Sequence, residues 1–86
     1  MKHYAATSFW RCFEALPPNV QTLARKNFVL LRQDLAHPSL QFKSVNHGRF
    51  RSVRIGIHYR ALGIPVAEGV NWFWIGSHAD YDRWMA

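Results

Sequence analysis

The chain has 86 residues, of which 49% are hydrophobic, 15% aromatic and 19% charged. This composition excludes a disordered tail. The length predicts one domain, residues 1–86, because shorter pieces would not each bury a useful core. No apolar run approaches the roughly eighteen residues of a membrane span, and the N-terminus lacks the apolar run of a signal peptide. Cys12 is the sole cysteine and cannot form an internal disulfide, so we expect a cytoplasmic protein.

The formal net charge is +6, from 11 Lys and Arg against 5 Asp and Glu. A field of this sign favours polyanionic partners, namely RNA, DNA, an acidic protein or anionic lipid. Most of the cations are Arg, whose planar fork matches phosphate oxygens better than the point charge of Lys does. The charge therefore favours a nucleic-acid partner, and a role in solubility alone is the alternative.

The first half of the chain is predicted to form a short strand and then two helices. Residues 2–6 have the pattern of a strand, and the Thr-Ser pair at 7–8 is a suitable N-cap for the first helix. The apolar face of that helix, spaced i, i+4, i+7, consists of Phe9, Phe13 and Leu16. The Pro-Pro pair at 17–18 ends it, and an apolar stripe predicts a second helix over 19–35. Two helices joined in this way are typical of an αα-hairpin.

After Pro38 the apolar period changes from that of a helix to that of strands. Strands are predicted over 39–46, on both sides of a hairpin loop at 56–58, and over 70–75 after Pro65 and Gly69, with a short helix or tail over 77–86. Helices followed by closely spaced strands predict an α+β fold. In that fold an N-terminal helical hairpin packs on one face of a twisted, mostly antiparallel sheet.

Positive charge is concentrated on the predicted middle strands. All acidic residues lie outside the stretch from Lys43 to Arg60. The cations in this stretch are Lys43, Arg49, Arg51, Arg54 and Arg60, with His47 and His58 among them. A solvated strand face usually mixes both signs, so an acid-free stretch favours contact with phosphate groups.

A three-residue hairpin loop over 56–58 would place Arg54 directly opposite Arg60 on neighbouring strands. Like charges in that position destabilise a sheet, and an anion that bridges them would offset the repulsion. The alternative is a different register, in which each Arg pairs separately with Asp80 or Asp82.

His78 directly follows the last predicted strand. A histidine at a strand end beside arginines is a candidate general base, because imidazole exchanges protons near neutral pH. The alternative is a surface histidine without a chemical role. Trp72 and Trp74 alternate in the same strand, where they either stack on bases or pack within the sheet.

Five segments together resemble the RelE/ParE superfamily of bacterial toxins: FW at 9–10, LPPNVQTLARKNF at 16–28, HPSLQFK at 37–43, RSVRIGIHYRALG at 51–63 and WFWIGSHADYDRW at 72–84. They cover most of the chain and contain the motifs S-V-R-x-G…Y-R and G-S-H-x-x-Y. The resemblance implies a microbial-RNase-like fold, in which a twisted, mainly antiparallel sheet cradles a basic groove with the helical hairpin behind it.

The resemblance also implies a function, that of the toxin in a toxin–antitoxin system. Such a toxin would be an endoribonuclease that cleaves ribosome-bound mRNA through attack of the RNA 2′-OH, without metal or cofactor. By position, Arg54 and Arg60 would hold the scissile phosphate, His78 would act as base or acid, and Tyr81 would orient the substrate base. The remaining candidates for nucleic-acid binding are Lys43, Arg49, Arg51 and His58. The implied protein partner is an acidic antitoxin.

Two residues differ from the pattern of the superfamily. Ser52 and Trp74 stand at positions where a cation is expected, the first two residues before Arg54 and the second before the last Gly-x-His. Two other functions therefore remain open. One is a ParE-like inhibitor that blocks DNA gyrase through helical and C-terminal surfaces, and the other is a non-catalytic relative that binds RNA or an antitoxin.

Overall fold

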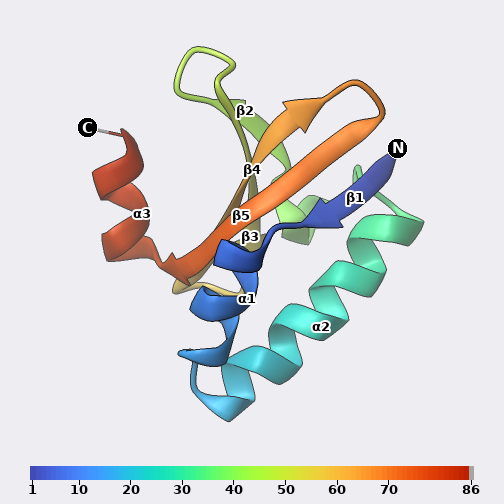
Figure 1. Ribbon diagram of the computed structural model, residues 1–86. Coiled ribbons are helices and arrows are strands. Elements are labelled where there is room, and N and C mark those ends of the chain that lie inside the picture. Colours follow the sequence, from blue (N-terminus) through green and yellow to red (C-terminus); the bar gives the residue numbers. More distant parts are fainter. Residues whose placement is uncertain (86) are drawn as a thin grey trace.

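The computed structural model describes residues 1–85, which form one five-stranded sheet with helices packed on both faces (Figure 1). The strands are β1 (Lys2–Ala5), β2 (Lys43–Val45), β3 (Phe50–Ile55), β4 (Tyr59–Val66) and β5 (Gly69–Ser77). Their order across the sheet is β1-β5-β4-β3-β2, with β1 parallel to β5 and the other neighbours antiparallel. The predicted α+β class and mostly antiparallel sheet are confirmed.

Helices α1 (Thr7–Glu14) and α2 (Pro18–Gln33) form the predicted hairpin on one face of the sheet (Figure 1). Pro18 occupies the first turn of α2, where the missing N–H of proline leaves no bond unmade. Gln21 fastens the joint, since its Nε2 donates to the carbonyl oxygens of Phe13 and Leu16, each at 3.1 Å. The core between this hairpin and the sheet consists of Phe13, Leu16, Val20, Ala24, Leu31, Leu40, Val53, Ile55, Ala61, Val70, Trp72 and Ile75.

The strand predicted over 39–46 is wrong in its first half. Pro38–Leu40 is a 3₁₀ turn instead, and the following Gln41 has a left-handed φ of 44°. The turn is stabilised locally, because the Nδ1 of His37 accepts a 3.2 Å hydrogen bond from the N–H of Ser39. Only Lys43–Val45 pairs with β3, as the edge strand β2.

Pro65 precedes the last strand in the sequence, as predicted, but it is itself part of a strand, since it lies within β4 opposite Val70 of β5. Strand β3 pairs with β4 only as far as Gly63, so Pro65 lies where β4 has a single neighbour. A proline is tolerated at such an edge position because its missing N–H interrupts no ladder. Strand β5 is correspondingly longer than predicted and runs from Gly69 to Ser77.

The second face of the sheet is covered by α3 (His78–Met85), the helix predicted at the C-terminus. A bulge in β5 helps to form this cover. Leu62 pairs with Trp74, but the adjacent Gly63 pairs with Trp72, so that Phe73 is the extra residue. Trp84 of α3 packs on Phe73 and Trp74, with ring centroids 5.3 and 6.2 Å apart.

Among residues 1–85, none of the helices combines the length and the apolar character that crossing a lipid bilayer would require.

Candidate functional site

Arg54 and Arg60 are direct register partners on β3 and β4, as the hairpin interpretation predicted. Their neighbours Val53, Ile55 and Ala61 are buried against the helical hairpin. Because side chains alternate along a strand, both arginines belong to the opposite face, the one that carries α3. The turn that sets this register has Gly56 at a φ of 64°, a conformation that favours glycine.

Arg60 is only 4% exposed. Its Nε donates a 2.8 Å hydrogen bond to the Oγ of Ser52, a side chain that is completely buried. Its Cζ lies 5.2 Å from the centre of the Tyr81 ring, which covers it from α3. Burial lowers the pKa of Arg60, the Tyr81 hydroxyl opposes this shift, and the charge of Arg54 reinforces it. The guanidinium nevertheless stays charged, since arginine titrates far above neutral pH.

Arg54 is more accessible than Arg60, being half-buried at the hairpin. Its Nε donates a 2.8 Å hydrogen bond to the carbonyl oxygen of Gly56, and its own carbonyl accepts from the Nδ2 of Asn27 on α2 at 3.1 Å. Neither Arg54 nor Arg60 forms an ion pair with a carboxylate in the part of the chain that the structure describes. The alternative in which Asp80 and Asp82 neutralise them is therefore wrong.

His78 and Tyr81 both belong to the first half of α3, which lies on the same face of the sheet as Arg54 and Arg60. The N–H of His78 donates a 2.7 Å hydrogen bond to the carbonyl oxygen of His58, which fixes the helix start beside the hairpin loop. The imidazole lies 5.3 Å from the Tyr81 ring, and its Nδ1 is 3.7 Å from an Asp82 oxygen. Its side chain is 52% exposed. Arg60, Tyr81 and His78 thus form a continuous series of contacts that ends in an accessible imidazole.

The other candidates are distributed around this series. Lys43 pairs with Ser52 across β2 and β3, so it lies on the same face as Arg60, and it is exposed. Arg49 and His58 are exposed in the turns before β3 and β4. Arg51 belongs to the opposite face by alternation, and its Nη1 donates to the Ser44 Oγ at 3.1 Å. The structure therefore does not bring Arg51 to Arg60.

Two features of this face were not predicted. The sequence showed Ser52 only as a residue that replaces an expected cation, yet its hydroxyl accepts the hydrogen bond from Arg60. The one feature of the sequence that could have indicated this role is the position of Ser52, a small polar residue two positions before Arg54 and on the same face of the sheet. The second feature is an aromatic cluster that unites distant parts of the chain, and its members are Phe50, Phe73, Trp74 and Trp84. No local pattern shows that Trp84 meets Phe50.

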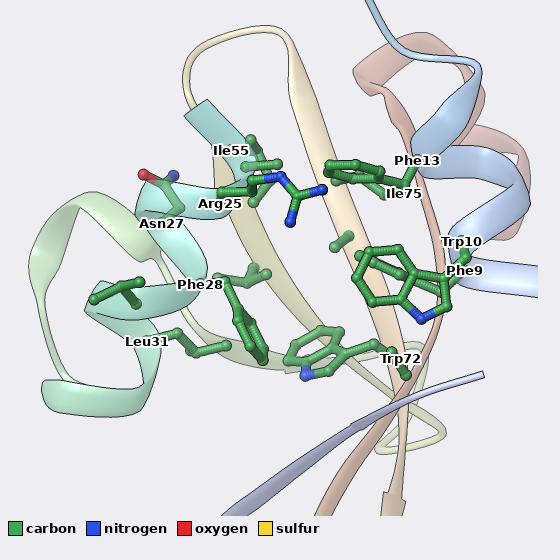
Figure 2. A pocket seen from close by; sticks show the side chains of 15 residues that line it. Phe9, Trp10, Phe13, Arg25, Asn27, Phe28, Leu31, Ile55, Trp72 and Ile75 are labelled. Carbon is green, nitrogen blue, oxygen red and sulfur yellow. The ribbon is translucent and has the colours of Figure 1, made fainter. Parts of the chain in front are cut away.

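A separate cavity lies on the opposite face, between α1, α2 and the sheet (Figure 2). Its volume is about 220 Å³, and nearly all of its walls are apolar. Figure 2 shows the guanidinium of Arg25 turned toward Phe13, and its Cζ lies 4.9 Å from the centre of that ring. Arg25 is the one titratable residue among those that line the cavity. Such walls suit an apolar partner rather than proton transfer.

Residues 1–85 contain no group of three or more His, Cys, Asp or Glu side chains placed to hold a metal ion. The candidate site itself combines two guanidinium groups, an imidazole and a phenol.

Comparisons with known proteins identify the fold and the family of the chain. The sequence model of a family described as ParE-like toxin domain matches residues 18–83. A chain in the crystal structure of the RelB–RelE antitoxin–toxin complex from Methanococcus jannaschii superposes with a TM-score of 0.73 at 9% identity, over 96% of this chain and 99% of that chain. A copper-bound mutant toxin from Helicobacter pylori gives a TM-score of 0.64 at 17% identity, over 93% of this chain and 97% of that chain.

At these identities the two structures establish a shared fold, and no curated protein sequence matches the chain. The family match is of a different kind, since it extends over most of the sequence and includes β3, β4, β5 and most of α3. The resemblance inferred from the motifs is thereby confirmed: the chain belongs to the family of ParE-like toxin domains, within the RelE/ParE superfamily of toxins.

Proposed function

We propose that this single-domain chain is the toxin of a toxin–antitoxin pair and that it cleaves ribosome-bound mRNA in the cytoplasm without a metal ion. The observation that carries the proposal is the cross-strand pair of Arg54 and Arg60, which has no carboxylate partner within residues 1–85 and is linked to His78 through the Tyr81 ring. Two unneutralised guanidinium groups on one face favour a dianionic or transition-state phosphate, and a nearby imidazole supplies proton transfer.

In the proposed reaction, the RNA 2′-OH attacks the adjacent phosphorus. His78 withdraws the proton of the 2′-OH, because its exposed imidazole contacts the Tyr81 ring that covers Arg60. Arg54 contacts the phosphate oxygens directly, and the charge of the buried Arg60 stabilises the same phosphate. The bond to the 5′ oxygen breaks, this oxygen takes a proton from water, and the products are a 2′,3′-cyclic phosphate and a 5′-OH end.

The burial of Arg60 sets a condition on this mechanism. Tyr81 covers the guanidinium at 5.2 Å, so a phosphate reaches Arg60 only when the Tyr81 ring moves aside. A displaced Tyr81 then orients the base next to the scissile phosphate. Lys43, Arg49 and His58 are exposed and hold the flanking phosphates. Arg51 contacts phosphates only at the edge of the sheet, because its side chain lies on the face opposite to Arg60.

Inducible expression followed by mapping of mRNA 5′ ends tests the proposal. The wild-type protein is expected to stop growth and to produce new 5′ ends within translated reading frames, and His78→Ala is expected to abolish both effects. Because His78 is exposed, its removal does not threaten the fold. Arg60→Ala is examined alongside, with circular dichroism to verify folding. His47→Asn is the matched control, since His47 is another exposed histidine, with a left-handed φ that asparagine tolerates.

We further propose an acidic antitoxin as the partner. The support is the net charge of +6 and the fold shared with a chain of the RelB–RelE antitoxin–toxin complex. The apolar cavity between α1 and α2 offers such a partner an anchor, and its rim carries Trp10 and Phe28, which are 44% and 40% exposed. Co-purification with the product of an adjoining acidic reading frame, and rescue of growth by it, is the expected result.

Inhibition of DNA gyrase is the second candidate, and the name of the matching family favours it. A gyrase inhibitor acts by binding and needs no base at position 78. Accumulation of cleaved DNA with intact mRNA, equally strong in His78→Ala, would select this candidate. If neither nucleic acid is cut, the chain is the non-catalytic relative.

A further inference from the structure

We propose that the face of α3 beside Trp74 and Trp84 binds a guanine base, and this inference rests on the proposed function in RNA cleavage. The site is a depression on the surface lined by Trp74, Asp80, Arg83 and Trp84. It combines two indoles with one acceptor and one donor side chain. None of these groups takes part in the contacts between Arg60, Tyr81 and His78.

The indoles offer a stacking surface. Trp84 is 39% exposed although it is the largest type of apolar side chain. Phe50 and Phe73 hold it from below at ring distances of 6.0 and 5.3 Å, and Trp74 adjoins it at 6.2 Å. A tryptophan held rigidly by neighbouring rings while part of it remains in water is suited to stacking on a base.

The polar pair selects the base. The Nη1 of Arg83 lies 3.7 Å from the Oδ1 of Asp80, and the two side chains are 83% and 55% exposed. An exposed pair at this distance contributes little to stability, so both groups are free to exchange partners. A carboxylate can accept from the N1–H and N2–H of guanine, while a guanidinium donates to O6 or N7. Adenine lacks both the O6 acceptor and the adjacent pair of donors.

The depression adjoins the proposed phosphate site. Gly76 is the register partner of Arg60, and a Cβ atom built on Gly76 would lie only 2.5 Å from the Cζ2 of Trp74. The indole of Trp74 therefore covers the backbone directly opposite Arg60. A nucleotide stacked on this surface would be a neighbour of the one whose phosphate meets Arg54 and Arg60.

Isothermal titration calorimetry with GMP, AMP, CMP and UMP tests the proposal on the purified chain. GMP is expected to bind at least about tenfold more tightly than AMP, the discrimination that one good bidentate contact provides. Trp84→Ala is expected to abolish binding of all four nucleotides. Tyr4→Ala is the matched control, because Tyr4 is an aromatic residue of β1 that is also 44% exposed but does not line the depression, and it should leave binding unchanged.

Asp80→Asn is a second variant that does not depend on the aromatic packing. It keeps the size of the side chain, so GMP is expected to bind about as weakly as AMP while stacking persists. Equal affinities of the four nucleotides for the wild-type chain, preference for CMP, or undiminished selectivity in Asp80→Asn would each overturn the proposal.

The titration requires neither ribosome nor catalysis, so its result is separate from that of the expression experiment. Selective binding of GMP by a chain that leaves mRNA intact would refute the nuclease and retain the guanine site. Cleavage of mRNA by a chain with no preference among nucleotides would retain the nuclease and refute the guanine site.

Discussion

Arg54 and Arg60 are direct register partners on β3 and β4, on the same face of the sheet, and no carboxylate of residues 1–85 pairs with either. Directly opposed like charges cost a sheet stability. The chain therefore maintains a local electrostatic strain at the position where the proposed reaction gathers negative charge, a pattern that is common where function and stability compete.

Arg54→Gln should stabilise the isolated protein by about 0.2–1 kcal/mol, because it removes the repulsion from Arg60. The gain should shrink at high salt, where charge repulsion is screened. Chemical denaturation at low and high ionic strength measures both effects, and Lys26→Gln on the exposed surface of α2 is the control. A loss of stability in Arg54→Gln would mean that its hydrogen bond to Gly56 outweighs the repulsion.

Ser52→Ala should cost about 1–3 kcal/mol in the free energy of unfolding, because it leaves the buried Nε of Arg60 without its acceptor. Ser44→Ala provides the comparison. Ser44 also accepts a hydrogen bond from an arginine, Arg51, but it is exposed on β2, and its loss should cost less than about 0.5 kcal/mol. Equal costs for the two variants, measured by urea denaturation, would show that Ser52 does not hold Arg60.

Acid should destabilise the protein through His3 of β1. The Nδ1 of His3 accepts a 3.1 Å hydrogen bond from the Nε1–H of Trp72, a bond that requires the neutral imidazole. Burial lowers the pKa of His3, and the N-terminal ammonium and Arg32 act in the same direction. The unfolded chain therefore binds the proton first, and the contribution of His3 to stability is lost as the pH falls below about 6.5.

The melting temperature at pH 8.0 and at pH 5.5 checks this expectation. His3→Gln has an amide that accepts the same hydrogen bond and does not titrate, so the drop in melting temperature should be smaller than in the wild type. The remaining histidines are present in both proteins and cancel in the comparison. Identical drops in the two proteins would remove His3 as the origin of the acid sensitivity.

Ala24→Leu should stabilise the chain by about 0.5–2 kcal/mol, as cavity-filling substitutions commonly do. Ala24 is 6% exposed and lines the cavity between α1 and α2, so the added carbon atoms enter apolar space. Thermal unfolding measures the gain, and Ala36→Leu, at an exposed position outside the cavity, should show none. A loss of stability in Ala24→Leu would show that the walls of the cavity leave no room for the added carbon atoms. If the variant is more stable, its affinity for the antitoxin should fall, because the cavity proposed to anchor the antitoxin is then filled.

The hairpin and the helices were predictable because their signals are local. Period-2 alternation and the glycine at position 56 determine the register of Arg54 and Arg60, and prolines mark the joint between α1 and α2. The error at 39–46 is also local in origin. Apolar alternation suggested a strand, but Pro38 and the His37 side chain favour a 3₁₀ turn, which buries Leu40 completely.

The burial of Arg60 was not predictable, because it depends on α3 folding back across the sheet. Tyr81 lies 21 positions after Arg60 in the sequence, and nothing near either residue indicates their contact. The same holds for the cluster around Trp84, which the bulge at Phe73 makes possible by interrupting the alternation of β5. Sequence patterns thus predicted that Arg54 and Arg60 are register partners, but not that Tyr81 covers Arg60.

Cleavage of ribosome-bound mRNA carrying a single 2′-deoxynucleotide tests the central claim most directly. The mRNA is matched to an unmodified control, and the modified residue replaces the one whose 2′-OH attacks. Purified wild-type protein should cut the control, leave a 2′,3′-cyclic phosphate and a 5′-OH end, and fail to cut the modified site. Cleavage of the 2′-deoxy site, or cleavage of the control by His78→Ala at the wild-type rate, would contradict it.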